Sequence, residues 1–383
     1  MTEPQHAPRF VRDGATWILY LTLGYYAFFL NVLGPLVPFV RAERGLSYTV
    51  GSLHFSAFAV GMIIAGLTAD RVVRALGRPR TLLIGGAGLV AGAALLLVGR
   101  DAVLTIGGAL VMGTLGSLLL AVIPAALADQ HGAARALALS EANTVAALCS
   151  LLGPLLVGIA AQTNVGWRAA PIATMLLWGL LAPMTTRVTV ARAVPISAAA
   201  GDPAGRLPQR YWRFWSALVL VIAVEFSVAF WSTEYLARKF AVAPGVAATL
   251  ATTFLAAIFV GRFVAGGLLR RSGPAQLLPA ALALTLLGFL AYWLAPTLWL
   301  SVAGLFVCGL GLANLYPFVL TLAVDAAGTR SSAASARASL ASGTAVLSAP
   351  LLLAALADQI SLGSAYGVVV LLLVGAFVLV RIR

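Results

Sequence analysis

Charged side chains within apolar stretches are the first residues in this sequence that could do chemistry. Glu225 lies within VLVIAVEFSVAFW, and Glu141 lies within ALSEANTVAA. Arg262 and Arg337 lie in two further stretches of mostly apolar or small residues. An ionisable group near the centre of a membrane helix costs about 3 kcal/mol or more, so each of these four residues suggests a function.

Glu225 suggests proton binding, because it lies near the middle of its apolar stretch. Desolvation of a carboxylate there favours the protonated form. Such a group could load and release a proton as a cavity around it alternates between the two sides of a membrane. The alternative is a permanently protonated glutamic acid that bonds a neighbouring backbone carbonyl.

The composition determines which elements can hold these residues. The chain has 383 residues, of which 61% are hydrophobic and 10% are charged, whereas about one-quarter of the residues of soluble domains are charged. Only helices and closed barrels can cross lipid, and the ten-residue alternation of barrel strands is missing. The sequence therefore predicts an all-α, polytopic membrane protein.

Charges, prolines and glycines divide the chain into twelve apolar segments, which predict twelve transmembrane helices. A helix needs about 20 apolar residues to cross the hydrocarbon core, so twelve crossings leave only short loops and tails. No room remains for a soluble catalytic domain. The segments lie near 15–40, 47–69, 80–99, 103–128, 134–161, 168–185, 214–236, 245–269, 276–295, 298–324, 333–357 and 362–380.

The net charge of +13 indicates an orientation in the membrane and no nucleic-acid partner, because the basic residues punctuate the apolar segments. With both termini in the cytoplasm, 19 of the 25 Lys and Arg residues fall on the cytoplasmic side, which leaves 6 on the other. The longest hydrophilic stretch, residues 186–213, follows six segments and precedes six. We interpret it as a cytoplasmic linker between a six-helix bundle at 1–185 and a second at 214–383.

The two halves resemble each other at two nearly equal offsets. VGMIIAGLTADR at 60–71 matches VGRFVAGGLLRR at 260–271, and LLGPLLVG at 151–158 matches LSAPLLLA at 347–354. Small residues recur wherever membrane helices pack closely, so chance similarity is the alternative. Because both matches pair equivalent segments, we favour a parallel, pseudo-symmetric repeat. In transporters built this way the substrate site lies at the midplane between the halves.

The loop GLTADRVVRALGRPR, residues 66–80, resembles the cytoplasmic signature loop of the major facilitator superfamily. EFSVAFW at 225–231 and GLGLANLYP at 309–317 are further similar to the fucose-permease-like branch. The resemblance implies a conformational latch in this loop, made of Gly66, Asp70, Arg71, Gly77, Arg78 and Arg80, with Asp129 as the partner of Arg71. The alternative for the arginines is membrane orientation alone, which leaves the acidic Asp70 unexplained.

Two departures from the family pattern concern ion coupling. The family's usual arginine in the fourth segment is missing, since GGALVMGTLG at 107–116 carries no charge. Any proton coupling must therefore use other residues. The antiporter-associated pattern of the fifth segment is partial, because Gly153, Pro154 and Gly158 are present while Cys149 and Val157 replace glycines. Only part of the pattern therefore favours export by antiport.

The family arrangement also implies a gate on the cytoplasmic side. There, the fifth segment faces the eighth across the two halves, and the second faces the eleventh. We therefore expect a Glu141–Arg262 pair and an Asp70–Arg337 pair to close the cytoplasmic side. The alternative is that Glu141 only holds arginines of neighbouring loops in place.

Polar and aromatic side chains at mid-depth are candidates for lining a substrate cavity. Each could instead pack between helices. The two cysteines, Cys149 and Cys308, lie in apolar segments and form no metal or disulfide spacing, so no metal site or cofactor is expected. The cavity candidates are Tyr25, Tyr26, Asn31, His54, Trp231, Asn314 and Tyr316.

We therefore expect a secondary active transporter that moves a small organic solute by alternating access, with protons as the coupling ion through Glu225. The resemblance implies a monomer in the bacterial plasma (inner) membrane. The alternatives are an uncoupled facilitator or an exporter of lipid-like substrates with the same fold. A membrane enzyme or receptor is disfavoured, because the sequence shows no metal spacing, nucleophile elbow or pair of carboxylates at one depth.

Overall fold

The computed structural model describes residues 11–186, 207–268 and 272–381. Helices account for nearly all residues in these ranges, and none of these residues lies in a strand, which confirms the predicted all-α class. Most of the predicted linker, residues 187–206, lies outside the described residues.

The N-terminal bundle begins where the Asp13 side chain accepts a hydrogen bond from the Thr16 backbone N–H and so caps the first helix. That helix ends at Gly45, whose positive φ of 60° suits a glycine. The helices of this bundle are α1 (Gly14–Arg44), α2 (Tyr48–Leu76), α3 (Arg78–Val98), α4 (Ala102–Gly116), α5 (Leu118–His131), α6 (Arg135–Ala161) and α7 (Ala169–Thr186).

The C-terminal bundle repeats this order with one extra short helix before the last. Its long α8 carries Glu225 near its centre. The helices are α8 (Gln209–Phe240), α9 (Pro244–Leu268), α10 (Pro274–Leu294), α11 (Leu298–Leu312), α12 (Leu315–Ala327), α13 (Ser331–Gln359), α14 (Leu362–Ala365) and α15 (Gly367–Arg381).

The predicted fourth and tenth segments are each broken near the middle, so that α4 is followed by α5 and α11 by α12. The packing around the two breaks is equivalent. A Cβ atom at Gly113 would collide with the Phe58 carbonyl oxygen, and one at Gly309 would lie 2.7 Å from the Phe254 carbonyl oxygen. Both members of the second pair lie 196 positions after those of the first. The internal repeat is therefore visible as repeated helix packing.

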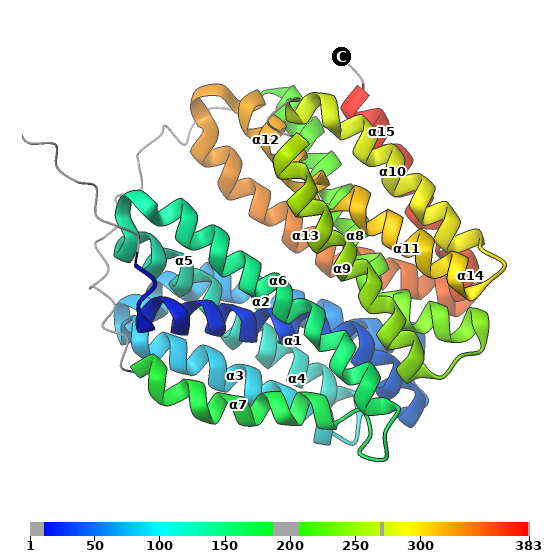
Figure 1. Cartoon of the computed structure of the whole chain (residues 1–383), viewed down its shortest axis with the longest axis horizontal. Coiled ribbons are helices and arrows are strands. Elements are labelled where there is room, and N and C mark those ends of the chain that lie inside the picture. Colours follow the sequence, from blue (N-terminus) through cyan, green and yellow to red (C-terminus); the bar gives the residue numbers. More distant parts are fainter. Residues whose placement is uncertain (1–10, 187–206, 269–271, 382–383) are drawn as a thin grey trace, which may run out of the picture.

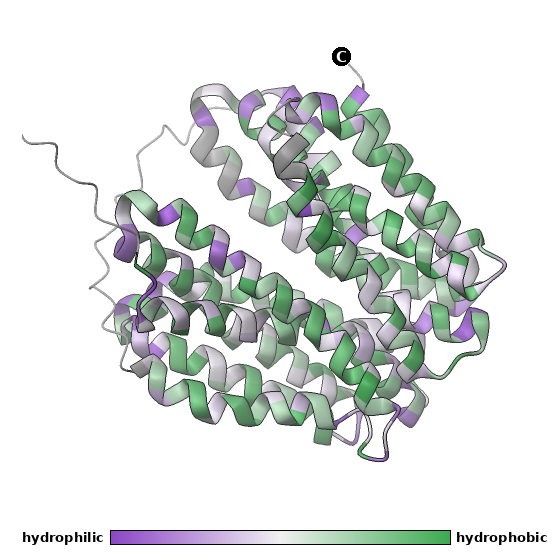
Figure 2. Ribbon diagram, in the orientation of Figure 1, coloured by the Kyte–Doolittle hydropathy of each residue, from purple (hydrophilic) through white to green (hydrophobic). Residues whose placement is uncertain are grey.

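The outer surface of the helices is apolar, as a bilayer requires. Ten helical stretches of the described chain are long and apolar enough to cross a membrane, and one of them, Ala102–Ala161, covers two predicted segments. The shorter α7 corresponds to the remaining segment. Figure 2 shows hydrophobic residues along the helices and hydrophilic ones mainly near their ends. Leu67, Val103 and Leu371 are among many large apolar side chains that face outward. The chain is an integral, multi-pass membrane protein.

The two bundles meet mainly through three pairs of helices, α1 with α8, α2 with α13, and α6 with α9. We call the end at which α1 begins and α15 finishes the termini end, and the opposite one the far end. In Figure 1 the bundles are in contact at the far end and diverge toward the termini end. The candidate site lies between these helices.

Candidate functional site between the two bundles

A buried ion pair joins the bundles at the far end. Arg41, in the last turn of α1, lies with its Nη1 atom 3.0 Å from the Glu234 Oε1 atom on α8, and the two side chains are only 7% and 8% exposed. Arg238 donates to the same carboxylate from one turn further along α8. Both guanidinium groups lie over the ring of Tyr48, at 3.9 and 5.1 Å. We call these four residues the far-end lock.

Asp358 of α13 adds a second connection next to the lock. Its two carboxylate oxygens accept hydrogen bonds from the backbone N–H groups of Tyr48 and Thr49, each at 2.7 Å. These N–H groups belong to the first turn of α2, where helical donors lack partners within the helix. The acid therefore caps a helix of the opposite bundle, where the helix dipole also favours a negative charge.

Aromatic side chains fill the space between the lock and the membrane centre. The rings of Phe55 on α2 and Phe230 on α8 stack with centroids 4.0 Å apart. Trp231 is fully buried beside Phe55 and donates to the Pro350 carbonyl oxygen at 3.3 Å. Ser56 donates to the Leu347 carbonyl oxygen across the same interface. The far end is therefore closed by packing as well as by charge.

The termini end is arranged differently. Arg12 pairs with Glu141 at 2.6 Å, and Arg78 pairs with Asp129 at 2.6 Å, both within the N-terminal bundle. Tyr211 donates to the Ala334 carbonyl oxygen within the C-terminal bundle. Arg213 and Trp215 likewise donate to carbonyl oxygens within the C-terminal bundle, so each of these contacts joins elements of a single bundle.

A cavity of about 430 Å³ opens between the bundles in this region. One wall is α6 and the other is α9, so both bundles contribute to the lining. Arg262 lies in this lining on α9, a helix that packs against α8, which carries Glu225. The lining residues are Ser140, Asn143, Thr144, Ala147, Phe259, Arg262 and Phe263.

Neither of the two predicted gate pairs is formed in this structure. Glu141 is engaged by Arg12 and by the Tyr20 hydroxyl, both on the N-terminal side. Arg337 lies with its guanidinium 5.9 Å from the ring of Trp212. Because the bundles diverge at this end, Arg262 faces the cavity instead of a carboxylate. The gate therefore stays a prediction for a conformation with the termini end closed.

The signature loop is mostly helical, because α2 continues to Leu76 before the chain turns. Gly77 makes the turn with a φ of 79°, a conformation that favours glycine. Arg78 is buried and pairs with Asp129, so in this structure Arg78 is the partner of Asp129 in place of the predicted Arg71. The physical reason is that Arg78 begins α3 beside the end of α5. Gly66 has open space around it, and Asp70, Arg71 and Arg80 are exposed.

Three of the predicted cavity residues lie inside the N-terminal bundle and do not face the other bundle. Tyr25 packs on Trp178 of α7, with ring centroids 5.3 Å apart. The Tyr26 hydroxyl bonds Ser117, and both ring nitrogens of His54 are bonded, to Gly51 and Thr105. In this conformation the Tyr25 ring packs within the N-terminal bundle, and the polar atoms of Tyr26 and His54 are hydrogen-bonded there.

The other four cavity candidates are spread over two regions. Asn31 donates to Ser150 and lies with Phe230 at the bundle interface, close to the aromatic residues that include Trp231. Asn314 lies in the break between α11 and α12 and donates to the Gly261 carbonyl oxygen inside the C-terminal bundle. Tyr316 is half-buried on α12. The structure therefore does not bring the seven residues together into one site.

The sequence analysis missed the far-end lock and the polar residues of α6 that line the cavity, Ser140, Asn143 and Thr144. Arg41 lies just beyond the predicted end of the first segment and Glu234 near the end of the seventh, where charges are ordinary. The i, i+4 spacing of Glu234 and Arg238 was an available signal. Ser140, Asn143 and Thr144 also share one helical face beside Glu141. Among the described residues, no cluster of His, Cys, Asp and Glu could hold a metal ion.

Known proteins share this architecture. The structure superposes on a bacterial homolog of the human lysosomal transporter Spinster, in an inward-facing and occupied conformation, with a TM-score of 0.75 and 15% identity over 95% of each chain. It superposes on the nucleoside transporter NupG with a TM-score of 0.78 and 11% identity, over 96% of this chain and 99% of the other. At these identities the likeness concerns the fold.

Sequence comparison assigns the family. An uncharacterized MFS-type transporter of Yersinia pestis is 24% identical over 165 residues, which are 42% of this chain and 43% of the relative. The matched segment thus spans less than half of that relative. A sequence model of the Major Facilitator Superfamily matches residues 19–235 and 214–383, nearly the whole chain. The chain therefore belongs to the Major Facilitator Superfamily of membrane transporters.

Proposed function

We propose that this protein is a secondary active transporter that moves a small organic solute across a bacterial plasma membrane by alternating access. One observation carries the proposal: the far-end lock and Asp358 hold the bundles together at one end, while a cavity lies between α6 and α9 toward the other. With the termini end in the cytoplasm, as the arginine bias favours, this conformation faces inward.

The lining of the cavity supports a polar organic substrate. Ser140, Asn143 and Thr144 offer hydroxyl and amide groups from α6, while Phe259 and Phe263 offer apolar surface from α9. A volume of about 430 Å³ falls within the range of about 300–1,000 Å³ that is usual for small-molecule sites. Arg262 is the single charged group among the described residues of this lining, so an acceptor group on the solute would find its partner there.

Glu225 and Arg262 together suggest how a proton would drive the cycle. An ionised Glu225 attracts Arg262 from the neighbouring helix, because opposite charges in a low-dielectric region interact strongly. A protonated Glu225 releases Arg262, which can then bond the solute or pair with Glu141 across the cavity. Proton loading would thereby be linked to closure of the termini end. In that closed state we assign the Glu141–Arg262 and Asp70–Arg337 pairs.

A second candidate function has one observation in its favour. A cavity of about 330 Å³ lies between α9, α10 and the broken helix α11–α12, and its lining is apolar apart from Asn314. Such a cavity would suit a lipid-like substrate that enters from the side. The export direction rests only on the partial antiporter pattern of α6.

The test is solute flux in proteoliposomes with and without an imposed pH gradient, over a panel of sugars, nucleosides and organic acids. We expect at least one solute to accumulate faster with the gradient. Glu225→Gln should abolish the dependence on the gradient while counterflow of the solute persists. Glu43→Gln, which alters an exposed ion pair within one bundle, is the matched control. Flux that ignores the gradient in the unmodified protein would favour the uncoupled facilitator.

A further inference from the structure

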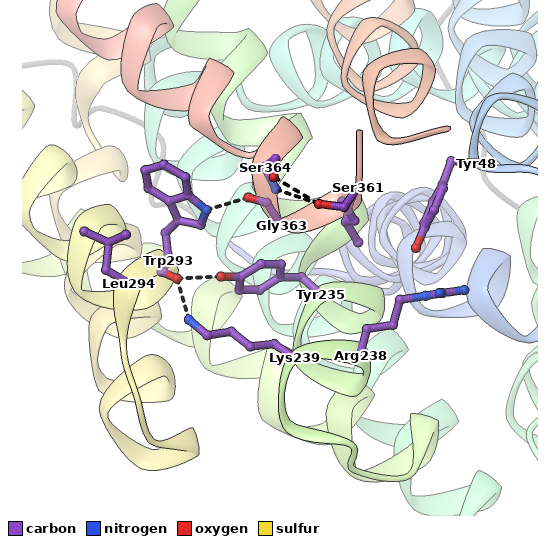
Figure 3. A pocket seen from close by; sticks show the side chains of 10 residues that line it. Tyr48, Tyr235, Arg238, Lys239, Trp293, Leu294, Ser361, Gly363 and Ser364 are labelled. Carbon is purple, nitrogen blue, oxygen red and sulfur yellow. Dashed lines mark hydrogen bonds between the residues drawn. The ribbon is translucent and has the colours of Figure 1, made fainter. Parts of the chain in front are cut away.

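A second cavity lies at the far end, mostly within the C-terminal bundle and beside the far-end lock (Figure 3). It has a volume of about 590 Å³ and is bounded by the ends of α8 and α10, the turn from α13 to α14, and Tyr48 of α2. Its size suits a small molecule. Two of its lining residues, Tyr48 and Arg238, belong to the far-end lock, but the transport cycle described above places no ligand here.

Both charged residues that line the cavity are cationic. They are Arg238 and Lys239, and none of the described residues of the lining is acidic. Lys239 is the only lysine of the chain. Its ammonium group donates to the Trp293 carbonyl oxygen, which also accepts a bond from the Tyr235 hydroxyl at 2.6 Å (Figure 3). An ammonium group has three donors, and the described residues engage one of them by a hydrogen bond.

Aromatic rings and hydroxyl groups complete the walls. Tyr48, Tyr235 and Trp293 offer flat apolar surfaces, and Ser361 adds a hydroxyl (Figure 3). Together these groups can hold a molecule with an anionic end and an apolar body. Cations and hydroxyls bind the first part, and rings pack against the second.

The backbone at the rim of this cavity is strained. In the part of the chain that the structure describes, only two residues other than glycine have a positive φ. They are Ser361 with 147°, which lines the cavity, and Ala241 with 51°, two positions after Lys239. Such conformations are energetically unfavourable and cluster at binding sites and switch regions.

We propose that this cavity binds an organic anion, a phosphate or carboxylate carried on an apolar or aromatic body, from the side opposite the termini. Two sources share this chemistry: a soluble solute and the headgroup of an anionic lipid. Leu294 lines the cavity and is largely exposed, so a lipid could reach it from the membrane boundary.

The site is connected to the far-end lock through Arg238. This residue lines the cavity and also donates to Glu234. A bound anion competes with Glu234 for the guanidinium group and so weakens the lock. This consequence rests on the proposed alternating access, whereas binding itself does not.

The experiment measures binding without transport, so its failure and the failure of the proposed function are distinguishable. The full chain is placed in phosphatidylcholine nanodiscs and titrated with phenyl phosphate, with phenol as the neutral comparison. We expect phenyl phosphate to bind at least tenfold more tightly than phenol. Lys239→Gln should weaken phenyl phosphate at least tenfold, while Lys239→Arg retains most of the affinity.

Arg100→Gln is the matched control, because Arg100 is an exposed cation at the far end of the N-terminal bundle and lies outside the cavity. It should leave the affinity unchanged. Phosphatidylglycerol added to the nanodiscs distinguishes the sources: competition with phenyl phosphate assigns the site to lipid headgroups, and its absence assigns it to soluble anions. Equal binding of phenyl phosphate and phenol, or equal losses in Lys239→Gln and Arg100→Gln, would overturn the proposal.

Discussion

Replacing Glu234 with glutamine is expected to open the far end of the protein. The substitution keeps the size of the side chain and removes the charge that holds Arg41 of the opposite bundle. Arg238, on the same helix, loses its partner at the same time. The change therefore acts on the contact between the bundles with little effect on the fold of either one.

The structure bounds the size of the effect. Removing one partner of a buried ion pair costs about 3–5 kcal/mol, because the remaining charge is left without compensation. Here Arg41 keeps its contact with the Tyr48 ring and a hydrogen bond to the Ser47 carbonyl oxygen, and a cation over a ring is worth about 0.5–2 kcal/mol. We therefore expect the closed far end to lose about 1.5–3 kcal/mol. That is about a 10- to 150-fold shift in the equilibrium between the two conformations.

Distances between spin labels on the two bundles would measure this shift. The two cysteines, Cys149 and Cys308, would first be replaced. Labels at Val165 and Trp299, which are 76% and 73% exposed, report on the far ends of the N- and C-terminal bundles. In Glu234→Gln the population with the longer separation should grow at the expense of the shorter one.

Glu43→Gln is the control, because Glu43 pairs with Arg168 at the same end but within one bundle. These side chains are 37% and 38% exposed, so the pair is worth about 0–1 kcal/mol. The distance distribution should not change in this variant. Identical distributions in Glu234→Gln and the unmodified protein, or equal shifts in both variants, would refute the lock.

Three further predictions concern stability and the second inter-bundle contact. Asp358→Ala should move the same label distances in the same direction by about 1 kcal/mol, because it removes the cap of α2; no change would contradict that cap. Gly113→Ala should lower the melting temperature, since a methyl group there collides with Phe58. Gly107→Ala in the same helix is the control and should be neutral, because a methyl group at that position has open space around it. Burial raises the pKa of Asp13, but hydrogen bonds from Thr16 and Gln130 outweigh it, so its pKa lies below the ordinary value. Asp13→Ala should therefore lose about 1 kcal/mol of stability at neutral pH, measured by thermal melting. This loss should shrink as the pH falls below about 4 and vanish at lower pH, because the carboxyl group becomes protonated. A loss that grows on acidification would contradict this.

The fold could be predicted because its signals are local in the sequence. Apolar segments of membrane-spanning length, separated by arginines, indicate helices and their order along the chain. The repeat was visible in Gly61 and Gly261, and the structure shows why: a side chain at either position would collide with the backbone at Leu110 or Leu310, again 200 positions apart. The family resemblance came from the short stretch 66–80.

The candidate site could be predicted only in part. Arg262 was selected because it is charged within an apolar segment, and it does line the cavity between the bundles. Tyr25 and His54 were selected for residue type and depth, but which side of a helix faces the other bundle depends on packing. Both side chains point into the interior of the N-terminal bundle.

The sequence by itself determined the class, the helices, the repeat and the family of this protein, because hydropathy and spacing act over short stretches of chain. Only the tertiary structure decided the pairing of charges: Arg41 with Glu234, and Glu141 with Arg12. These partners lie more than one hundred positions apart in the sequence, and the sequence contains several carboxylates that could pair with each cation. In the alternating access that we propose, the partner of a charge also depends on the conformation, which no local pattern specifies.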